Sequence, residues 1–135
     1  MGRIIEQVAA LAIRDNCVCM VTSRNRRRWV IPKGQIEKGQ SATETALAEA
    51  WEEAGLLGRI ESEPIGTFSY TKNNLEHIVT VFPMIVTIER NQWPECRERR
   101  RVWLALDQAL ARIHEQELRE LLQAHCELAE VTIVS

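Results

Sequence analysis

Runs of apolar and β-branched residues mark the first strands of the chain. Residues 4–13 and 17–22 form two such runs, and the polar segment 14–16 separates them. This pattern predicts a β-hairpin with a tight turn. A third run at residues 29–31 is followed by proline, lysine and glycine, so a loop is expected over residues 32–40.

The clearest helix is expected over residues 41–55. Ser41 and Glu44 match a capping box, and Gly55 is the residue type that most often ends a helix. At about 100° per residue, one side of this helix carries small or apolar residues and is expected to pack on a sheet. The residues on that side are Thr43, Leu47, Ala50, Trp51 and Ala54.

Further strands are expected in the middle of the chain. Residues 60–70 form a β-type run that is broken by Pro-Ile-Gly, and residues 77–88 form a longer one. Pro83 lies inside the second run, which suggests an edge strand or a bulge because proline cannot donate a backbone hydrogen bond. A last strand is expected over residues 101–106.

The end of the chain is expected to be helical. Asp107 is expected to cap a helix over residues 108–113, and residues 117–125 continue the helical pattern. Residues 131–134 are interpreted as either a stray strand or a frayed tail. Helices that cover a mixed sheet favour an α+β fold.

Length and charge limit the functions that remain. With 135 residues, the chain is expected to form one domain over residues 1–135, with a core that needs no disulfide or structural metal. A net charge of -2 provides no overall basic field, so binding to a membrane or to bulk nucleic acid is not expected. No stretch approaches the roughly 20 apolar residues of a membrane span, and no secretory signal pattern is present, so a cytoplasmic location is expected.

The four cysteines and three histidines lack the spacing of a metal site. Cys17 and Cys19 form one close pair, while Cys96 and Cys126 lie far from them and from each other. Buried free thiols are therefore favoured over a zinc site.

Three glutamates occupy the side of the expected helix opposite its packing side. Glu49, Glu52 and Glu53 are close together in the C-terminal half, where they repel one another and meet an unfavourable helix dipole. Such a group is often only a solvent-exposed face. In this arrangement, however, a compensating cation is favoured, and Mg²⁺ or Mn²⁺ suits carboxylate oxygens and commonly shares its coordination with substrate phosphates. The pattern predicts a divalent cation and a phosphate-containing substrate.

The glutamates belong to a longer spaced motif. Gly34 is followed after five residues by Gln40, and seven further residues lead to Ala48-Glu49-Ala50-Trp51-Glu52-Glu53-Ala54-Gly55-Leu56. This motif resembles the Nudix box. Gln40 and Ala48 stand where the family has a glutamate and an arginine that form an ion pair. Because both are replaced together, neither leaves an unpaired charge.

The resemblance implies a Nudix-type α/β/α sandwich with a mixed β-sheet and Mg²⁺-dependent hydrolysis of phosphoanhydride bonds. It implies that Glu49 and Glu53 bind the metal. Glu52 would act on or orient the attacking water beside that metal, which makes Glu52 and Glu49 the expected catalytic residues. The main-chain carbonyl of Lys33 or Gly34 is a further candidate ligand.

The substrate is expected to be a nucleoside diphosphate-linked or polyphosphorylated small molecule. Residues 93–95, 100–103 and 105–122 resemble the branch that contains diphosphoinositol polyphosphate and diadenosine polyphosphate phosphohydrolases. Arginines in the segments 24–28 and 97–101 either bind phosphates or only carry surface charge. Tyr70, Lys72 and His77 either line the pocket mouth or flank a turn. The expected substrate-binding residues are Arg28, Lys33, Gly34, Tyr70, Lys72 and Arg101.

Two functions remain open at the level of sequence. One is an active hydrolase; the other is a catalytically impaired nucleotide-binding or regulatory module that kept the fold. The three acids favour the hydrolase, because such a cluster is costly without a cation. The sequence leaves open whether the chain is a monomer or a homodimer.

Overall fold

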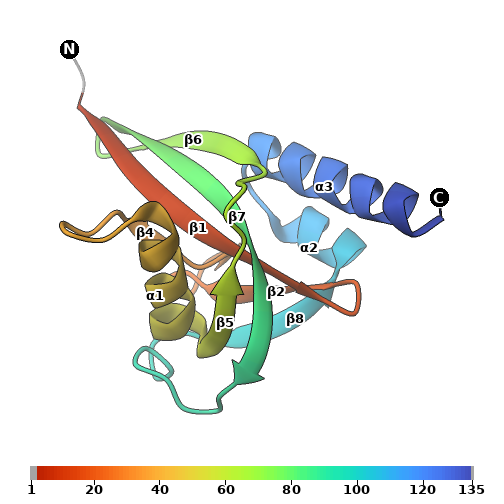
Figure 1. Ribbon diagram of the computed structural model, residues 1–135. Helices are drawn as coiled ribbons and strands as arrows, with labels where there is room; N and C mark the ends of the chain where they lie inside the picture. Colours follow the sequence, from red (N-terminus) through yellow and green to blue (C-terminus); the bar gives the residue numbers. More distant parts are fainter. Residues whose placement is uncertain (1–2, 135) are drawn as a thin grey trace.

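The computed structural model describes residues 3–134 as a sheet covered by three helices (Figure 1). Figure 1 shows the strands separating α1 from α2 and α3. None of the helices in this part of the chain is long and apolar enough to cross a membrane. The elements are β1 (Ile4–Arg14), β2 (Cys17–Thr22), β3 (Trp29–Val30), β4 (Lys33–Gln35), α1 (Ala42–Ala54), β5 (Leu56–Ile60), β6 (Gly66–Lys72), β7 (Leu75–Glu89), β8 (Arg101–Ala105), α2 (Leu106–Arg112) and α3 (Gln116–Val134).

Strand β1 is the centre of the sheet. It runs parallel to β7, from the pair Ile4 and Glu76 to the pair Ala12 and Met84, and antiparallel to β2 and β4. Strands β5 and β6 pair with β7, while β3 and β8 pair with β2. The sheet is therefore mixed, as expected for an α+β fold.

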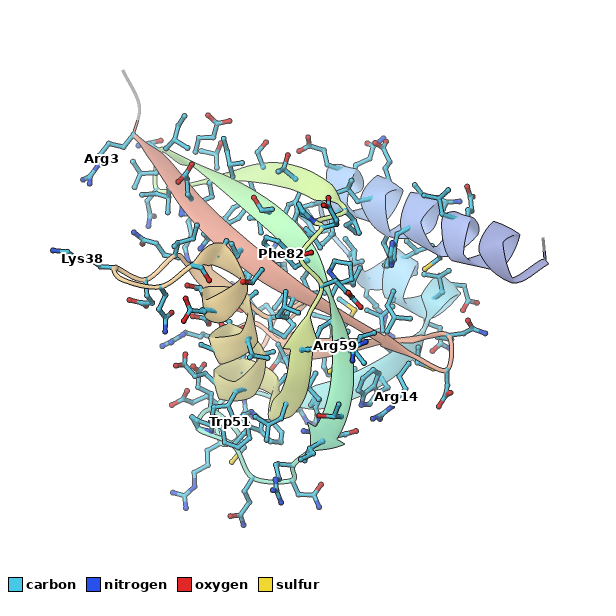
Figure 2. The ribbon with its side chains drawn as sticks, in the orientation of Figure 1. Arg3, Arg14, Lys38, Trp51, Arg59 and Phe82 are labelled. Carbon is cyan, nitrogen blue, oxygen red and sulfur yellow. The ribbon has the colours of Figure 1, made fainter. Side chains whose placement is uncertain are left out.

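Both faces of β1 are buried, and alternate residues serve different layers. Val8, Ala10 and Ala12 belong to the cluster that includes the buried alanines of α1. Ala9 and Leu11 belong to the cluster formed with α2 and α3. Because successive side chains of a strand point to opposite faces, one continuous apolar run supports both helical layers. Figure 2 shows Phe82 inside the packed molecule and Lys38 extending from the loop before α1.

The turn between β1 and β2 has the conformation that a tight hairpin requires. Asp15 and Asn16 both have left-handed backbone angles, with φ of 53° and 60°. Aspartate and asparagine tolerate this region better than most residues, and two such positions match the twist of the flanking strands. The predicted hairpin is confirmed.

Pro83 does not lie on an edge strand. Strand β7 has β1 on one side, and on the other side its partner changes from β6 at Val81 to β5 at Met84. The Pro83 carbonyl accepts a bond of 2.9 Å from the Glu61 amide in the connection between β5 and β6. Leu11 of β1 pairs with Pro83 on one side, but no residue of β5 or β6 pairs with it on the other, and proline is tolerated in this gap.

Three other expectations about secondary structure were wrong. The expected loop over residues 32–40 contains the short strand β4, which pairs with β1. Asp107 is not the cap of α2: the helix begins at Leu106, Ala105 is its N-cap, and no side chain caps it. Residues 131–134 continue α3 rather than forming a strand or a frayed tail.

The double-sided burial of β1 predicts a large cost for truncating its core side chains. The change Leu11→Ala should lower the free energy of unfolding by about 2–5 kcal/mol, because it removes apolar contacts and leaves a cavity. Ile88→Ala is the matched control, since Ile88 is 44% exposed whereas Leu11 is 1% exposed. Urea unfolding measures both effects, and equal losses would contradict this description of the core.

Candidate active site

The N-terminus of α1 is fixed by the capping box that the sequence predicts. The Glu44 amide donates to the Ser41 hydroxyl at 3.1 Å, and the Ser41 amide donates to the Glu44 carboxylate at 2.9 Å. Just before it, the Gln40 side-chain carbonyl accepts from the Thr45 hydroxyl at 3.1 Å. A neutral hydrogen bond therefore ties the loop to the helix, although Gln40 and Ala48 cannot form the family's ion pair.

The C-terminus of α1 is held by residues from the segment that follows β7. Gly55 ends the helix in the left-handed conformation, with φ of 70°. The Trp93 indole N–H donates to the Glu53 carbonyl at 2.9 Å, and Arg101 donates to the Ala54 carbonyl at 2.7 Å. These donors satisfy carbonyls that a helix end leaves free, and Arg101 adds positive charge at the negative end of the helix dipole.

Arg101 is consequently absent from the pocket in which it was expected. Its guanidinium stacks on the Trp93 ring, 4.5 Å from the ring centroid, and forms an ion pair of 3.0 Å with Glu89. This arginine closes the helix end, and it does not line the pocket over Glu49 and Glu53.

The expected packing side of α1 is confirmed in part: Ala50 and Ala54 are buried and Leu47 packs against the same cluster. Its centre is a stripe of alanines, Ala46, Ala50 and Ala54, which are all fully buried. Small side chains let the helix approach the sheet closely, whereas Thr43, Leu47 and Trp51 are only half-buried. As a result, Glu53 lies beside the buried stripe rather than opposite it, at 6% exposure. Glu52 is exposed and Glu49 is half-buried, so the three glutamates differ in their burial.

Glu49 and Glu53 face the main chain of β4. The Lys33 amide donates to the Glu53 carboxylate at 3.3 Å. At position 34, a larger side chain would collide with the carboxylate of Glu49, so this carboxylate would have to move from its present place. The Gly34 position of the motif therefore has a direct steric explanation.

The environment of this pair disfavours two negative charges. Burial, and then the neighbouring Glu53, raise the pKa of Glu49 to about 8. Burial also raises the pKa of Glu53, although Glu49, the Arg99 charge and the Lys33 amide act in the opposite direction. Because burial removes water from both carboxylates, a nearby positive charge would stabilise their ionised forms.

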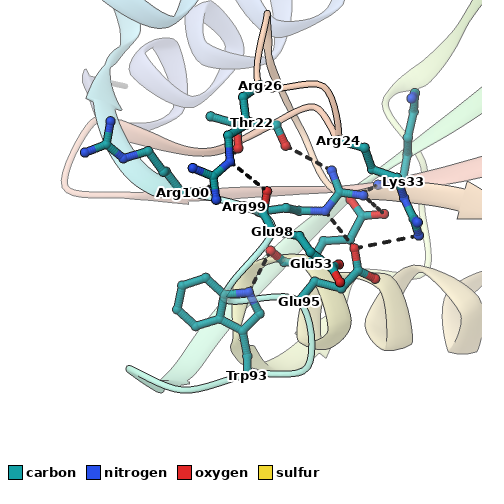
Figure 3. A network of polar contacts seen from close by, with 10 residues as sticks. All are labelled: Thr22, Arg24, Arg26, Lys33, Glu53, Trp93, Glu95, Glu98, Arg99 and Arg100. Atoms are coloured by element: carbon teal, nitrogen blue, oxygen red, sulfur yellow. Dashed lines mark hydrogen bonds and ion pairs between the residues drawn. The ribbon is translucent and has the colours of Figure 1, made fainter.

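Arg99 is the cation that contacts Glu53 of this pair. It is 7% exposed, and it lies 3.5 Å from the Glu53 carboxylate and 2.8 Å from the Glu95 carboxylate. It also donates to the Thr22 carbonyl at 2.9 Å, at the end of β2 (Figure 3). One side chain thus links the carboxylate helix to a central strand and to the segment between β7 and β8.

A pocket of about 880 Å³ opens over the two glutamates. Among the expected substrate-binding residues, it brings together Arg28, Lys33, Gly34, Tyr70 and Lys72 with Glu49 and Glu53. Arg101 and Glu52 do not line it. The functional roles of these residues remain predictions, but most of them share one pocket.

The basic wall of the pocket is ordered by aromatic rings. The Lys33 ammonium lies 5.1 Å from the centroid of the Tyr70 ring, which stacks on His77 at 4.6 Å. The Tyr70 hydroxyl donates to the Gln7 side chain at 2.6 Å. Burial lowers the pKa of Lys33, while the nearby carboxylate of Glu53 favours its charged form. The Lys33 ammonium thus lies against the Tyr70 ring at this wall of the pocket.

The sequence interpretation overlooked residues that follow α2. His114 and Glu115 line the pocket, and the Glu115 carboxylate lies 3.6 Å from Arg28. Arg99 had been grouped only with other basic residues. No local spacing connects these positions to α1, so a sequence motif carried no signal for them.

The donor set fits a hard divalent cation in part. Within residues 3–134, no three His, Cys, Asp or Glu side chains are arranged to hold a metal. The two oxygen-donor carboxylates of Glu49 and Glu53 are nevertheless adjacent and lie beside strand β4. Mg²⁺ needs only one or two carboxylates when waters and substrate phosphates complete its coordination. The residues present fit such a site, with Glu52 outside it.

Comparisons with known proteins agree with this geometry. The model of the NUDIX domain matches residues 5–125. Nudix hydrolase 4 from Arabidopsis thaliana is 34% identical over 113 residues, which are 82% of this chain and 54% of that protein. Diphosphoinositol polyphosphate phosphohydrolase 3-alpha from Mus musculus is 28% identical over 98 residues, covering 71% of this chain and 58% of that protein. The chain spans about half the length of the curated relatives it matches.

A solved structure shows the same fold. The binary complex of a C. elegans Ap4A hydrolase superimposes with a TM-score of 0.77, at 16% sequence identity, and covers 93% of this chain and 98% of that one. The Nudix resemblance and the expected Nudix-type sandwich are confirmed.

The buried pair predicts that Arg99 matters more to stability than its neighbours. Arg99→Met should lower the free energy of unfolding by roughly 3 kcal/mol, because it leaves Glu53 buried without its cationic partner. Arg100→Met is the control, since Arg100 is exposed and its side chain makes no ion pair in the described part of the chain.

Adding Glu53→Gln to Arg99→Met should recover part of the loss, because no buried charge then remains unpaired. Urea denaturation of the four proteins in this cycle measures the coupling. Additive losses would mean that the two side chains do not stabilise each other.

Proposed function

The chain belongs to the NUDIX domain family, and from this premise we propose that it hydrolyses phosphoanhydride bonds in a polyphosphorylated small molecule, with Mg²⁺ or Mn²⁺ as cofactor. The observation that carries the proposal is the pair Glu49 and Glu53, packed against Gly34 at the base of a pocket with basic walls. Relatives named Nudix hydrolases support the same class of reaction.

In this proposal, Glu49 and Glu53 hold the cation. When bound, a divalent cation polarises phosphate oxygens and lowers the pKa of water. Arg99 and the Lys33 amide keep Glu53 in place. The Glu49 carboxylate occupies the space that a side chain at position 34 would fill. Preorganised groups of this kind need little rearrangement during the reaction.

The remaining pocket residues would bind the phosphates and manage the proton of the attacking water. Lys33 and Arg28 supply positive charge to phosphate oxygens. Glu49 lines the pocket and Glu52 is exposed outside it, which favours Glu49 as the group nearest to the water. Glu52 remains the second candidate, acting from the rim.

Diadenosine polyphosphates and diphosphoinositol polyphosphates are the proposed substrate classes. A mouse relative that is named as a diphosphoinositol polyphosphate phosphohydrolase and a structural neighbour that is an Ap4A hydrolase support this choice. We also propose that residues 1–135 work as one domain in the cytoplasm, as the sequence suggested.

The departures at Gln40 and Ala48 favour one alternative, a catalytically impaired nucleotide-binding or regulatory module. The contacts of Gln40 with Thr45, and of Arg99 with Glu53, argue against it because they hold the loop and one carboxylate in place without the family's ion pair. The activity assay below separates the two functions, since the alternative predicts binding without turnover.

Turnover should depend on Glu53 and on the cation. Glu53→Gln should reduce turnover of diadenosine tetraphosphate at least about a hundredfold, since even small misplacement of catalytic groups has effects of this size. Product formation followed by chromatography in Mg²⁺, and again with excess EDTA, measures both dependences. The control Glu63→Gln changes an exposed glutamate outside the pocket and should retain the activity of the unmodified chain.

Two results would count against the proposed hydrolase. One is unchanged turnover in Glu53→Gln, and the other is unchanged turnover in EDTA. Substrate binding with no turnover in the unmodified chain would support the impaired module instead.

A further inference from the structure

Two hollows flank Trp29 beside the main pocket. The larger, of about 470 Å³, is lined by Arg27, Arg28, Trp29, Ala111, Arg112, Ile113, His114 and Arg119. The smaller, of about 270 Å³, also contains Arg27, Arg28 and Trp29, together with Thr22, Arg26 and Arg100. We call the two together the arginine groove. Within the described residues, no acidic side chain lines either hollow.

Three arginines of this groove have no side-chain partner within the described residues, whereas Arg26, Arg28 and Arg119 have one. Arg99 and Arg101 form ion pairs with glutamates. The side chains of Arg27, Arg100 and Arg112 make no hydrogen bond or ion pair within residues 3–134, and all three are exposed. Several cations on one surface repel one another, so the groove would bind an anion with several charges favourably.

The groove is continuous with the pocket over the glutamates. Arg28 and His114 line both the larger hollow and the main pocket. The Arg28 guanidinium forms an ion pair of 3.6 Å with Glu115. Arg119 makes only a long hydrogen bond of 3.5 Å to the Ile113 carbonyl. A molecule that fills the main pocket and extends past Arg28 would therefore enter the arginine groove.

We propose that the arginine groove is a subsite for the outer phosphates of the substrate, next to the pair of carboxylates at which cleavage occurs. This inference rests on the proposed function and narrows its substrate class: linear or branched molecules with four or more phosphates are preferred to diphosphates. Guanidinium groups suit this task because each can donate two parallel hydrogen bonds to one phosphate.

Equilibrium binding tests the groove without turnover. Inorganic tripolyphosphate is titrated calorimetrically into the metal-free chain and into the variant Arg27→Gln with Arg112→Gln. The variant should bind roughly tenfold more weakly, because two charged hydrogen-bond donors are lost at an exposed site. The affinity of the unmodified chain should also fall as salt is raised.

The matched control removes the same charge elsewhere. Arg3 and Arg59 are exposed and line neither hollow of the groove nor the main pocket (Figure 2), so Arg3→Gln with Arg59→Gln should bind tripolyphosphate like the unmodified chain. Equal weakening in both double variants would show that only net charge matters, and it would overturn the subsite.

Kinetics then test whether the groove serves the substrate. The KM for diadenosine tetraphosphate should rise roughly tenfold in the groove variant, and it should rise more than the KM for ADP-ribose, which carries two phosphates. An equal change for both substrates, or weaker tripolyphosphate binding without any change in KM, would overturn the proposal. If the unmodified chain hydrolyses neither compound, the proposed function fails, whereas the binding titration still decides whether the groove holds a polyphosphate.

Discussion

The buried contact between Arg99 and Glu53 constrains the whole site. A carboxylate at 6% exposure needs a partner, and Arg99 supplies it while also bonding Glu95 and the Thr22 carbonyl. Breaking a buried pair is far more costly than losing a surface one. The helix that carries the carboxylates is therefore positioned relative to β2 and to the segment after β7, which are distant in sequence.

The same residues serve the fold and the candidate chemistry. The alanine stripe of α1 allows the helix to lie close to β1, and this places Glu53 at the edge of the interior rather than in solvent. Gly34 leaves space for Glu49, while Gly55 lets Trp93 close the helix end. The spacing of the motif therefore follows from packing requirements as well as from the positions of the proposed metal ligands.

The sequence predicted those features that depend only on residues close together in the chain. The hairpin, the capping box of Ser41 and the Nudix motif follow from short-range geometry, so residues 14–16 and 34–56 carried enough information. The burial of Glu53, the position of Arg101 and the central placement of Pro83 depend on partners that only the tertiary structure brings near. Helical periodicity predicted the burial of Ala50 and Ala54, but it did not predict that Ala46 and Glu53 are buried beside them, because it does not describe how closely a row of alanines can approach a sheet.

The central claim is that Glu49 and Glu53 together form the site of a divalent cation. Electron paramagnetic resonance of Mn²⁺ added to the chain without substrate tests it most directly. The account predicts that the unmodified chain binds Mn²⁺, that Glu49→Gln and Glu53→Gln each weaken binding at least about tenfold, and that Glu52→Gln weakens it less, since Glu52 lies outside the pocket. Equal affinity of the unmodified chain and the Glu49 and Glu53 variants would contradict it.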